Sequence, residues 1–136
     1  MAWPCSGADI VVAHNDEVSF RQALQKANGM AGANRIVFAS SSGTIQLTSS
    51  AVITAANLTI EGPATFDVRN LPIGLDVRAS GVTLRSLRVL NVTNGGGGLR
   101  IVSTNAPLED ITIEQCEVHG DNPNGNPVAE IGRAHV

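Results

Sequence analysis

The chain has 136 residues, a length typical of one domain, and its 43% apolar and 15% charged residues suffice to build a core. The net charge is −3 and the nine Lys and Arg residues form no cluster, which excludes the positive surface that nucleic acid requires. No stretch reaches the roughly 18 to 20 apolar residues that cross a bilayer, and the first residues lack the pattern of a secretion signal. We therefore expect no nucleic-acid partner and no membrane span, in a chain that is either a fragment or cytoplasmic.

The first part of the chain predicts one helix after a short strand at residues 10–12. Ser19 and Gln22 have the spacing of a capping box, in which each side chain binds a free backbone amide of the first turn. Apolar residues then recur with the helical period, at Phe20, Ala23, Leu24 and Ala27. We predict a helix from about Phe20 to Asn28 that ends at Gly29.

Strands are predicted at residues 35–38 and 44–48, and a repeat follows. Residues 57–62, 81–86 and 110–115 share the order apolar, Thr, apolar from their second position, and they begin 24 and 29 residues apart. Residues 74–77 and 98–101 form a second similar pair, also 24 residues apart. Short strands that return at such intervals indicate a solenoid.

We therefore predict an all-β fold, a right-handed parallel β-helix with an N-terminal capping helix. It has roughly three to four coils from Arg35 to about Val118, and the helix covers its open end. Residues 1–34 form the strand and cap, and residues 35–130 form the coils, truncated at the C-terminus. Residues 131–136 resemble the translation of a sequencing adapter, so we expect a non-native tail; an ordinary polar tail is the alternative.

Equivalent residues in such a stack lie about 4.8 Å apart, so the aligned repeats predict contacts. Leu58, Val82 and Ile111 form one inward column, and Ile60, Leu84 and Ile113 form the next. The outward columns are Thr59, Thr83 and Thr112, and Glu61, Arg85 and Glu114. Acid and base alternate in the last column, where each ion pair contributes about 0 to 1 kcal/mol and helps to hold the register.

The same alignment predicts ion pairs between Arg88 and Glu117 and between Asp76 and Arg100. Cys116 takes an inward position, so we interpret it as a small buried apolar residue rather than a nucleophile or a ligand. A disulfide with Cys5 is not expected, because the two cysteines lie at opposite ends of the predicted solenoid.

Carboxylates are the candidates for catalysis, because paired acids carry out glycoside hydrolysis. Those in one outer region are Glu61, Glu114, Glu117 and Asp121. The first three have basic column neighbours that oppose a general-acid role, so we interpret them as structural and assign no catalytic residue.

No metal or cofactor is expected either. Residues 120–126 are rich in oxygen ligands but lack the order of a helix-loop-helix calcium site, and a polar turn is the preferred interpretation. No helix follows the glycines at 95–98 to form a phosphate site. His14 and His119 have no second ligand at a meaningful spacing and are expected at the surface, and His135 lies in the predicted tail.

A more specific signal lies between residues 19 and 63. Residues 19–24 (Ser-Phe-Arg-Gln-Ala-Leu), 34–38 (Asn-Arg-Ile-Val-Phe) and 57–63 (Asn-Leu-Thr-Ile-Glu-Gly-Pro) resemble the N-terminal region of bacterial right-handed parallel β-helix proteins, which belong to the pectate-lyase-like superfamily. The resemblance implies a secreted or surface-attached protein with a fold shared by carbohydrate-degrading enzymes. No catalytic motif of a lyase or hydrolase matches this sequence.

Two functions follow as expectations. The first is a non-catalytic, adhesin-like or structural segment of an extracellular or bacterial cell-surface protein, with a polysaccharide or another cell-surface ligand as its partner. The alternative is the N-terminal part of a polysaccharide lyase or glycoside hydrolase whose active site lies in missing coils. Fold analogy alone supports the alternative, whereas the lack of a catalytic constellation favours the first.

Overall fold

The computed structural model describes residues 6–30, 32–40, 43–69, 71–92, 97–102, 108–120 and 129–132. One helix and a series of strands lie in these segments. In chain order they are β1 (Ser6–Val12), α1 (Glu17–Asn28), β2 (Ala33–Phe38), β3 (Ile45–Gln46), β4 (Ala51–Ile53), β5 (Thr59–Asp67), β6 (Ile73–Val77), β7 (Thr83–Val92), β8 (Gly97–Val102), β9 (Thr112–Glu114), β10 (Glu117–Gly120) and β11 (Ala129–Gly132).

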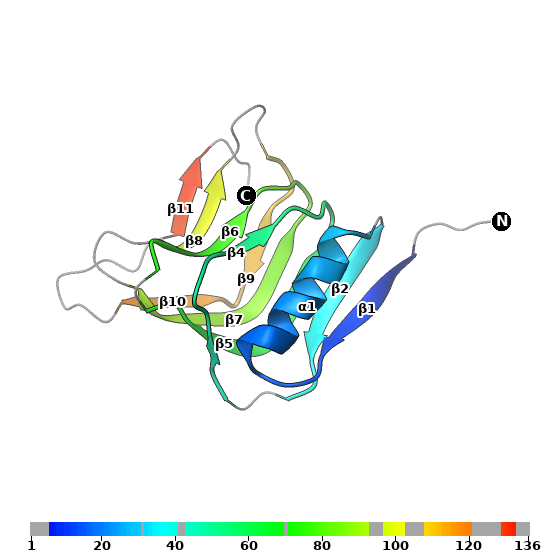
Figure 1. Ribbon diagram of the computed structural model, residues 1–136. Helices are drawn as coiled ribbons and strands as arrows, with labels where there is room; N and C mark the ends of the chain where they lie inside the picture. Colours follow the sequence, from blue (N-terminus) through cyan, green and yellow to red (C-terminus); the bar gives the residue numbers. More distant parts are fainter. Residues whose placement is uncertain are drawn as a thin grey trace.

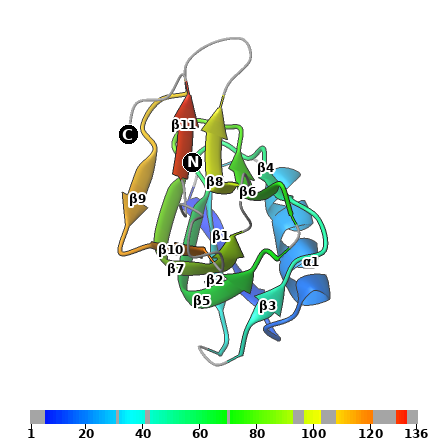
Figure 2. The same cartoon turned by 90° about the vertical axis from the view of Figure 1, so that its left-hand side faces the viewer.

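The strands form two sheets, and all the described pairings are parallel. Sheet A has seven strands in the order β1-β2-β5-β7-β10, with β3 beside β5 and β9 beside β7. Sheet B has four strands in the order β11-β8-β6-β4. Helix α1 lies next to β4 and against β2 (Figure 1). Figure 2 shows the strands of sheet B following one another toward α1.

The predicted all-β, right-handed parallel β-helix is wrong. The described residues form two separate parallel sheets and a helix, and they contain no closed solenoid. Strands β1 and β2 pair in parallel across α1, which makes the predicted cap the crossover of a β–α–β unit. The error has a physical origin, because a sequence repeat fixes which strands pair but not how the strands of one repeat are connected.

The predicted in-register pairing of the repeats is confirmed. Thr59 pairs with Thr83 and Thr83 with Thr112, so each equivalent position lies beside its counterpart. The inward residues of the three repeats are buried in one hydrophobic core, with Ile113 partly buried at its margin; they are Leu58, Ile60, Val82, Leu84 and Ile111. Residues from both sheets, such as Phe66 and Leu75, belong to this core.

Each repeat begins with the same backbone turn. Asn57, Gly81 and Asp110 have φ values of 61°, 76° and 59°, in the left-handed region that Gly, Asn and Asp adopt most easily. The turns bind one another, because the Asn57 amide donates to the Ser80 carbonyl and the Gly81 amide to the Glu109 carbonyl. Repetition in the sequence is thus also repetition of a hydrogen-bonded turn.

Helix α1 begins earlier than predicted. Its N-cap is Asp16, whose carboxylate accepts a hydrogen bond from the Ser19 amide at 2.8 Å. The capping box at Ser19 and Gln22 is therefore wrong, because a charged acceptor three residues upstream takes the cap position. The predicted apolar face is confirmed: Phe20, Ala23, Leu24 and Ala27 are buried.

The non-native origin of residues 131–136 stays a prediction. Residues 131 and 132 lie in β11, which pairs with β8 in regular register. Residues 133–136 lie outside the described residues.

Leu24 tests the packing of α1. Leu24→Asp places a charge without a partner among buried apolar side chains and should lower the free energy of unfolding by about 3 kcal/mol in urea denaturation. Val18→Asp on the same helix is the matched control, because Val18 is 66% exposed, and it should have little effect. Equal losses in the two variants would contradict the buried face assigned to α1.

Candidate functional site

A row of alternating charges crosses one face of sheet A. It consists of Asp9 on β1, Arg35 on β2, Glu61 on β5, Arg85 on β7 and Glu114 on β9, and we call it the charged ladder. Successive nitrogen and oxygen atoms lie 2.9, 3.1, 3.8 and 3.2 Å apart. The predicted column of Glu61, Arg85 and Glu114 is confirmed, and the structure extends it by two strands.

Ionic contacts fix the charge state at the β1 end of the ladder. A hydrogen bond from Arg35 lowers the pKa of Asp9, and the same bond raises the pKa of Arg35. The ladder contains three acids and two bases, so it carries a net charge of −1 and ends on an acid at both sides. The hydroxyl-bearing row of Thr59, Thr83 and Thr112 runs beside it in the same strands.

A second ionic group lies on β7 and β10. Arg88 Nε lies 3.8 Å from Glu117 Oε1, which confirms the predicted pair. His119 Nε2 lies 2.8 Å from the same oxygen, so His119 is at the surface as predicted but has a partner that was not predicted. The hydrogen bond with His119, and then the charge of Arg88, lower the pKa of Glu117.

The predicted catalytic candidates are thus bound by bases. Glu61 and Glu114 contact Arg85, and Glu117 contacts Arg88, while Asp121 lies outside the described residues. An ion-paired carboxylate is a poor general acid, because its partner favours the charged form. The described part of the chain also holds no group of three or more His, Cys, Asp or Glu side chains placed to bind a metal, and most of the loop at 120–126 lies outside it.

Asp76 and Cys116 are the other predicted positions. Asp76 lies opposite Arg100 in the predicted register, but the ion pair recorded for its buried carboxylate is with Arg78, the residue that follows β6, at 2.8 Å from Nη2. Cys116 is partly buried against the core, as its inward position predicts. Burial raises the pKa of its thiol, which opposes a role as a nucleophile. Cys5 lies outside the described residues.

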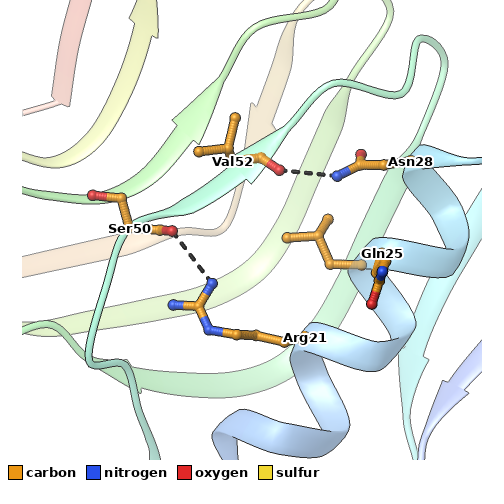
Figure 3. A pocket seen from close by; sticks show the side chains of 6 residues that line it. Arg21, Gln25, Asn28, Ser50 and Val52 are labelled. Atoms are coloured by element: carbon orange, nitrogen blue, oxygen red, sulfur yellow. Dashed lines mark hydrogen bonds between the residues drawn. The ribbon is translucent and has the colours of Figure 1, made fainter.

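A groove of about 340 Å³ separates α1 from the edge of sheet B, and polar side chains of α1 cross it (Figure 3). Asn28 Nδ2 donates to the Val52 carbonyl at 3.1 Å, and Asn28 Oδ1 accepts from the Thr54 amide at 3.0 Å. Arg21 Nη1 donates to the Ser50 carbonyl at 3.3 Å. These bonds satisfy backbone groups that an edge strand would otherwise expose, so α1 seals the edge of β4.

Four residues of these arrangements were not predicted: Asp9, Arg21, Asn28 and Arg35. A signal existed for two of them, because residues 9–12 and 35–38 share the order charge, Ile, Val, apolar, 26 residues apart. These segments are the strands β1 and β2, which pair with Asp9 opposite Arg35. Arg21 and Asn28 bind backbone atoms of residues distant in the sequence. No local sequence pattern predicts such contacts.

No family model, curated protein or solved structure matches the chain. The resemblance to pectate-lyase-like proteins therefore stays a prediction. Among the described residues, no helix combines the length and apolar character that a membrane crossing requires.

Asn28 tests the sealing of β4. Asn28→Ala removes hydrogen bonds to the backbone of residues 52, 54 and 55 and should destabilise the protein by about 2 kcal/mol in urea unfolding. Gln25→Ala, in the same groove, is the control and should change stability by less than about 0.5 kcal/mol. Indistinguishable losses would show that Asn28 does not seal the strand.

The contacts of Glu17 predict that the stability of the fold depends on pH. Burial raises its pKa, but hydrogen bonds from Thr48 and Arg21 outweigh this effect and lower it below the ordinary value. An acid with a lowered pKa stabilises the folded state above its unfolded pKa, and the stabilisation is lost as pH falls through the folded pKa. Glu17→Gln should therefore cost roughly 1 kcal/mol at about pH 7 and almost nothing at about pH 3.

The measurement is the urea midpoint of wild type and variant across this pH range. Glu109→Gln, at an exposed acid, is the control and should give a nearly constant difference. A deficit for Glu17→Gln that is independent of pH would contradict the account.

Proposed function

We propose that the chain is a non-catalytic segment of an extracellular or bacterial cell-surface protein, with an adhesin-like or structural role. The charged ladder is the observation that carries the proposal. Each of its carboxylates binds an arginine of the neighbouring strand, so these acids fasten strand to strand. Carboxylates paired in this way hold the strands in register. Their arginine partners keep them charged, so the pairing supports a structural role of this face rather than a catalytic one.

The ligand that best fits this face is a polysaccharide or another cell-surface polymer. The row of Thr59, Thr83 and Thr112 presents hydroxyl groups at the regular spacing of the strands, about 4.8 Å. Hydroxyl groups both donate and accept hydrogen bonds, as sugar hydroxyls do. A regular row of such groups matches a regular polymer better than a small molecule, which binds in a concave site.

The enzyme alternative predicts a measurable reaction. If the chain is non-catalytic, the purified protein releases neither unsaturated nor reducing ends from pectin or alginate. If the protein released such ends and the Glu114→Gln variant did not, the proposal would be overturned. That result would show that an acid of the charged ladder is catalytic.

Binding is tested by affinity electrophoresis in gels that contain pectin or alginate. Thr83→Val should reduce the retardation of the protein, because it removes the central hydroxyl of the row. Thr44→Val is the control, because Thr44 is exposed and lies outside the row. Equal retardation of the two variants would contradict the assignment of the threonine face.

A further inference from the structure

The two sheets end differently on the side of α1. Sheet B ends at β4, where the Val52 carbonyl binds Asn28 and the carbonyl of Ser50, just before the strand, binds Arg21. Sheet A ends at β1, which lies at the outer margin of the described structure (Figure 1). The helix that seals one edge therefore packs beside a second edge strand.

The backbone of β1 points alternately toward β2 and away from it. The Val12 carbonyl accepts from the Ala39 amide at 3.1 Å, and the Ala8 amide donates to Asn34 Oδ1 at 2.9 Å, both on the β2 side. Because backbone groups alternate along a strand, the amides and carbonyls of Asp9 and Val11 point to the outer edge. This is the arrangement that accepts an added strand.

Side chains around this edge define what an added strand must carry. Val11 is 56% exposed, whereas Ile10 is buried on the opposite face. A groove of about 240 Å³ lies between β1 and α1, and its lining includes Ile10, Gln22, Ala23 and Lys26 together with Asp9 and Val11. Because Lys26 supplies a positive charge on the α1 side, the groove-facing positions of an added strand are apolar rather than basic. Alternate side chains of an added strand would enter this groove, and the others would lie beside Asp9 and Val11.

The charge at the end of the ladder indicates which side chain an added strand carries there. The ladder ends on Asp9 at this edge, and Arg35 occupies the position opposite Asp9 on the other side. A Lys or Arg on the added strand would continue the alternation of acid and base. Stacking of a second copy end to end would instead bring Asp9 toward the acidic end at Glu114, which disfavours self-association.

We propose that the edge of β1 binds an extended segment of a partner protein by parallel strand addition. The segment carries a basic residue opposite Asp9, followed by an alternation of groove-facing apolar and outward β-branched residues. This inference rests on β1 and does not depend on the role proposed for the threonine and charge rows.

The probe is a fluorescent peptide Ala-Asn-Arg-Ile-Val-Phe, a copy of β2, which already shows the required pattern beside β1. Its control is the same peptide with Glu in place of Arg. Fluorescence anisotropy should show that the Arg peptide binds about two- to fivefold more tightly than the Glu peptide. The Asp9→Lys protein should reverse this preference, and added salt should reduce it.

Val11→Pro tests the edge itself. Proline removes an amide that points outward, so the variant keeps the hydrogen bonds to β2 while losing a donor for the added strand. It should abolish binding, whereas Val18→Ala, at an exposed apolar residue of α1, should leave it unchanged. Circular dichroism checks whether both variants fold. If Val11→Pro does not fold, the reversed peptide preference of Asp9→Lys decides the test.

Equal affinity for the two peptides, or no binding of either, would overturn the proposal. Sedimentation of the protein alone adds a further test. A dimer that forms with increasing concentration and is lost in Val11→Pro would also overturn it, because the occupant of the edge would then be a second copy.

Discussion

Parallel pairing of equivalent residues at the start of each repeat is the constraint on which the rest of the structure depends. Ile60 lies beside Leu84 in the core and Glu61 lies opposite Arg85 outside, and the register shifts by one residue only after Glu61. A slip of one residue would exchange the two faces and bring Glu61 into the core. The same strand register therefore sets both the hydrophobic core and the charged ladder. A change of register would disrupt both together.

Open sheets have edge strands with unpaired backbone groups, and α1 lies beside two of them, β4 and β1. It covers the edge of β4 but not that of β1. Its apolar residues Phe20 and Leu24 enter the core, while Arg21 and Asn28 bind the backbone of β4 and its neighbours. One helix thus covers apolar surface and satisfies backbone groups together. The edge of β1, with Asp9 and Val11 outward, is left as the surface on which another chain can act.

Much of the register was predictable because alternation with period two is a strong signal and the repeats supply several copies of it. The buried positions Leu58, Val82 and Ile111 followed directly from this pattern. The closed solenoid was a wrong inference, since parallel strands at a regular period are compatible with two separate sheets. The helix start was wrong as well, because Asp16 competes with Ser19 for the same cap.

Other contacts of the candidate site had weaker signals. Asp9 and Arg35 belong to strands with a similar order of residues, but a single pair of four-residue segments does not establish a repeat. Asn28 binds backbone atoms 24 to 27 residues away, and backbone atoms are the same at every position of a sequence. Such contacts depend on tertiary placement rather than on local pattern.

Native-state hydrogen exchange of individual amides tests the central claim, that one register holds the sheets while α1 seals only one edge. The Thr83 and Thr112 amides, which donate to the Leu58 and Val82 carbonyls, should exchange slowly. The Thr54 amide, bound by Asn28, should also be protected, and the Val11 amide should exchange at nearly the rate of an open chain. Protection of Val11 equal to that of Thr83, or rapid exchange at Thr54, would contradict the account.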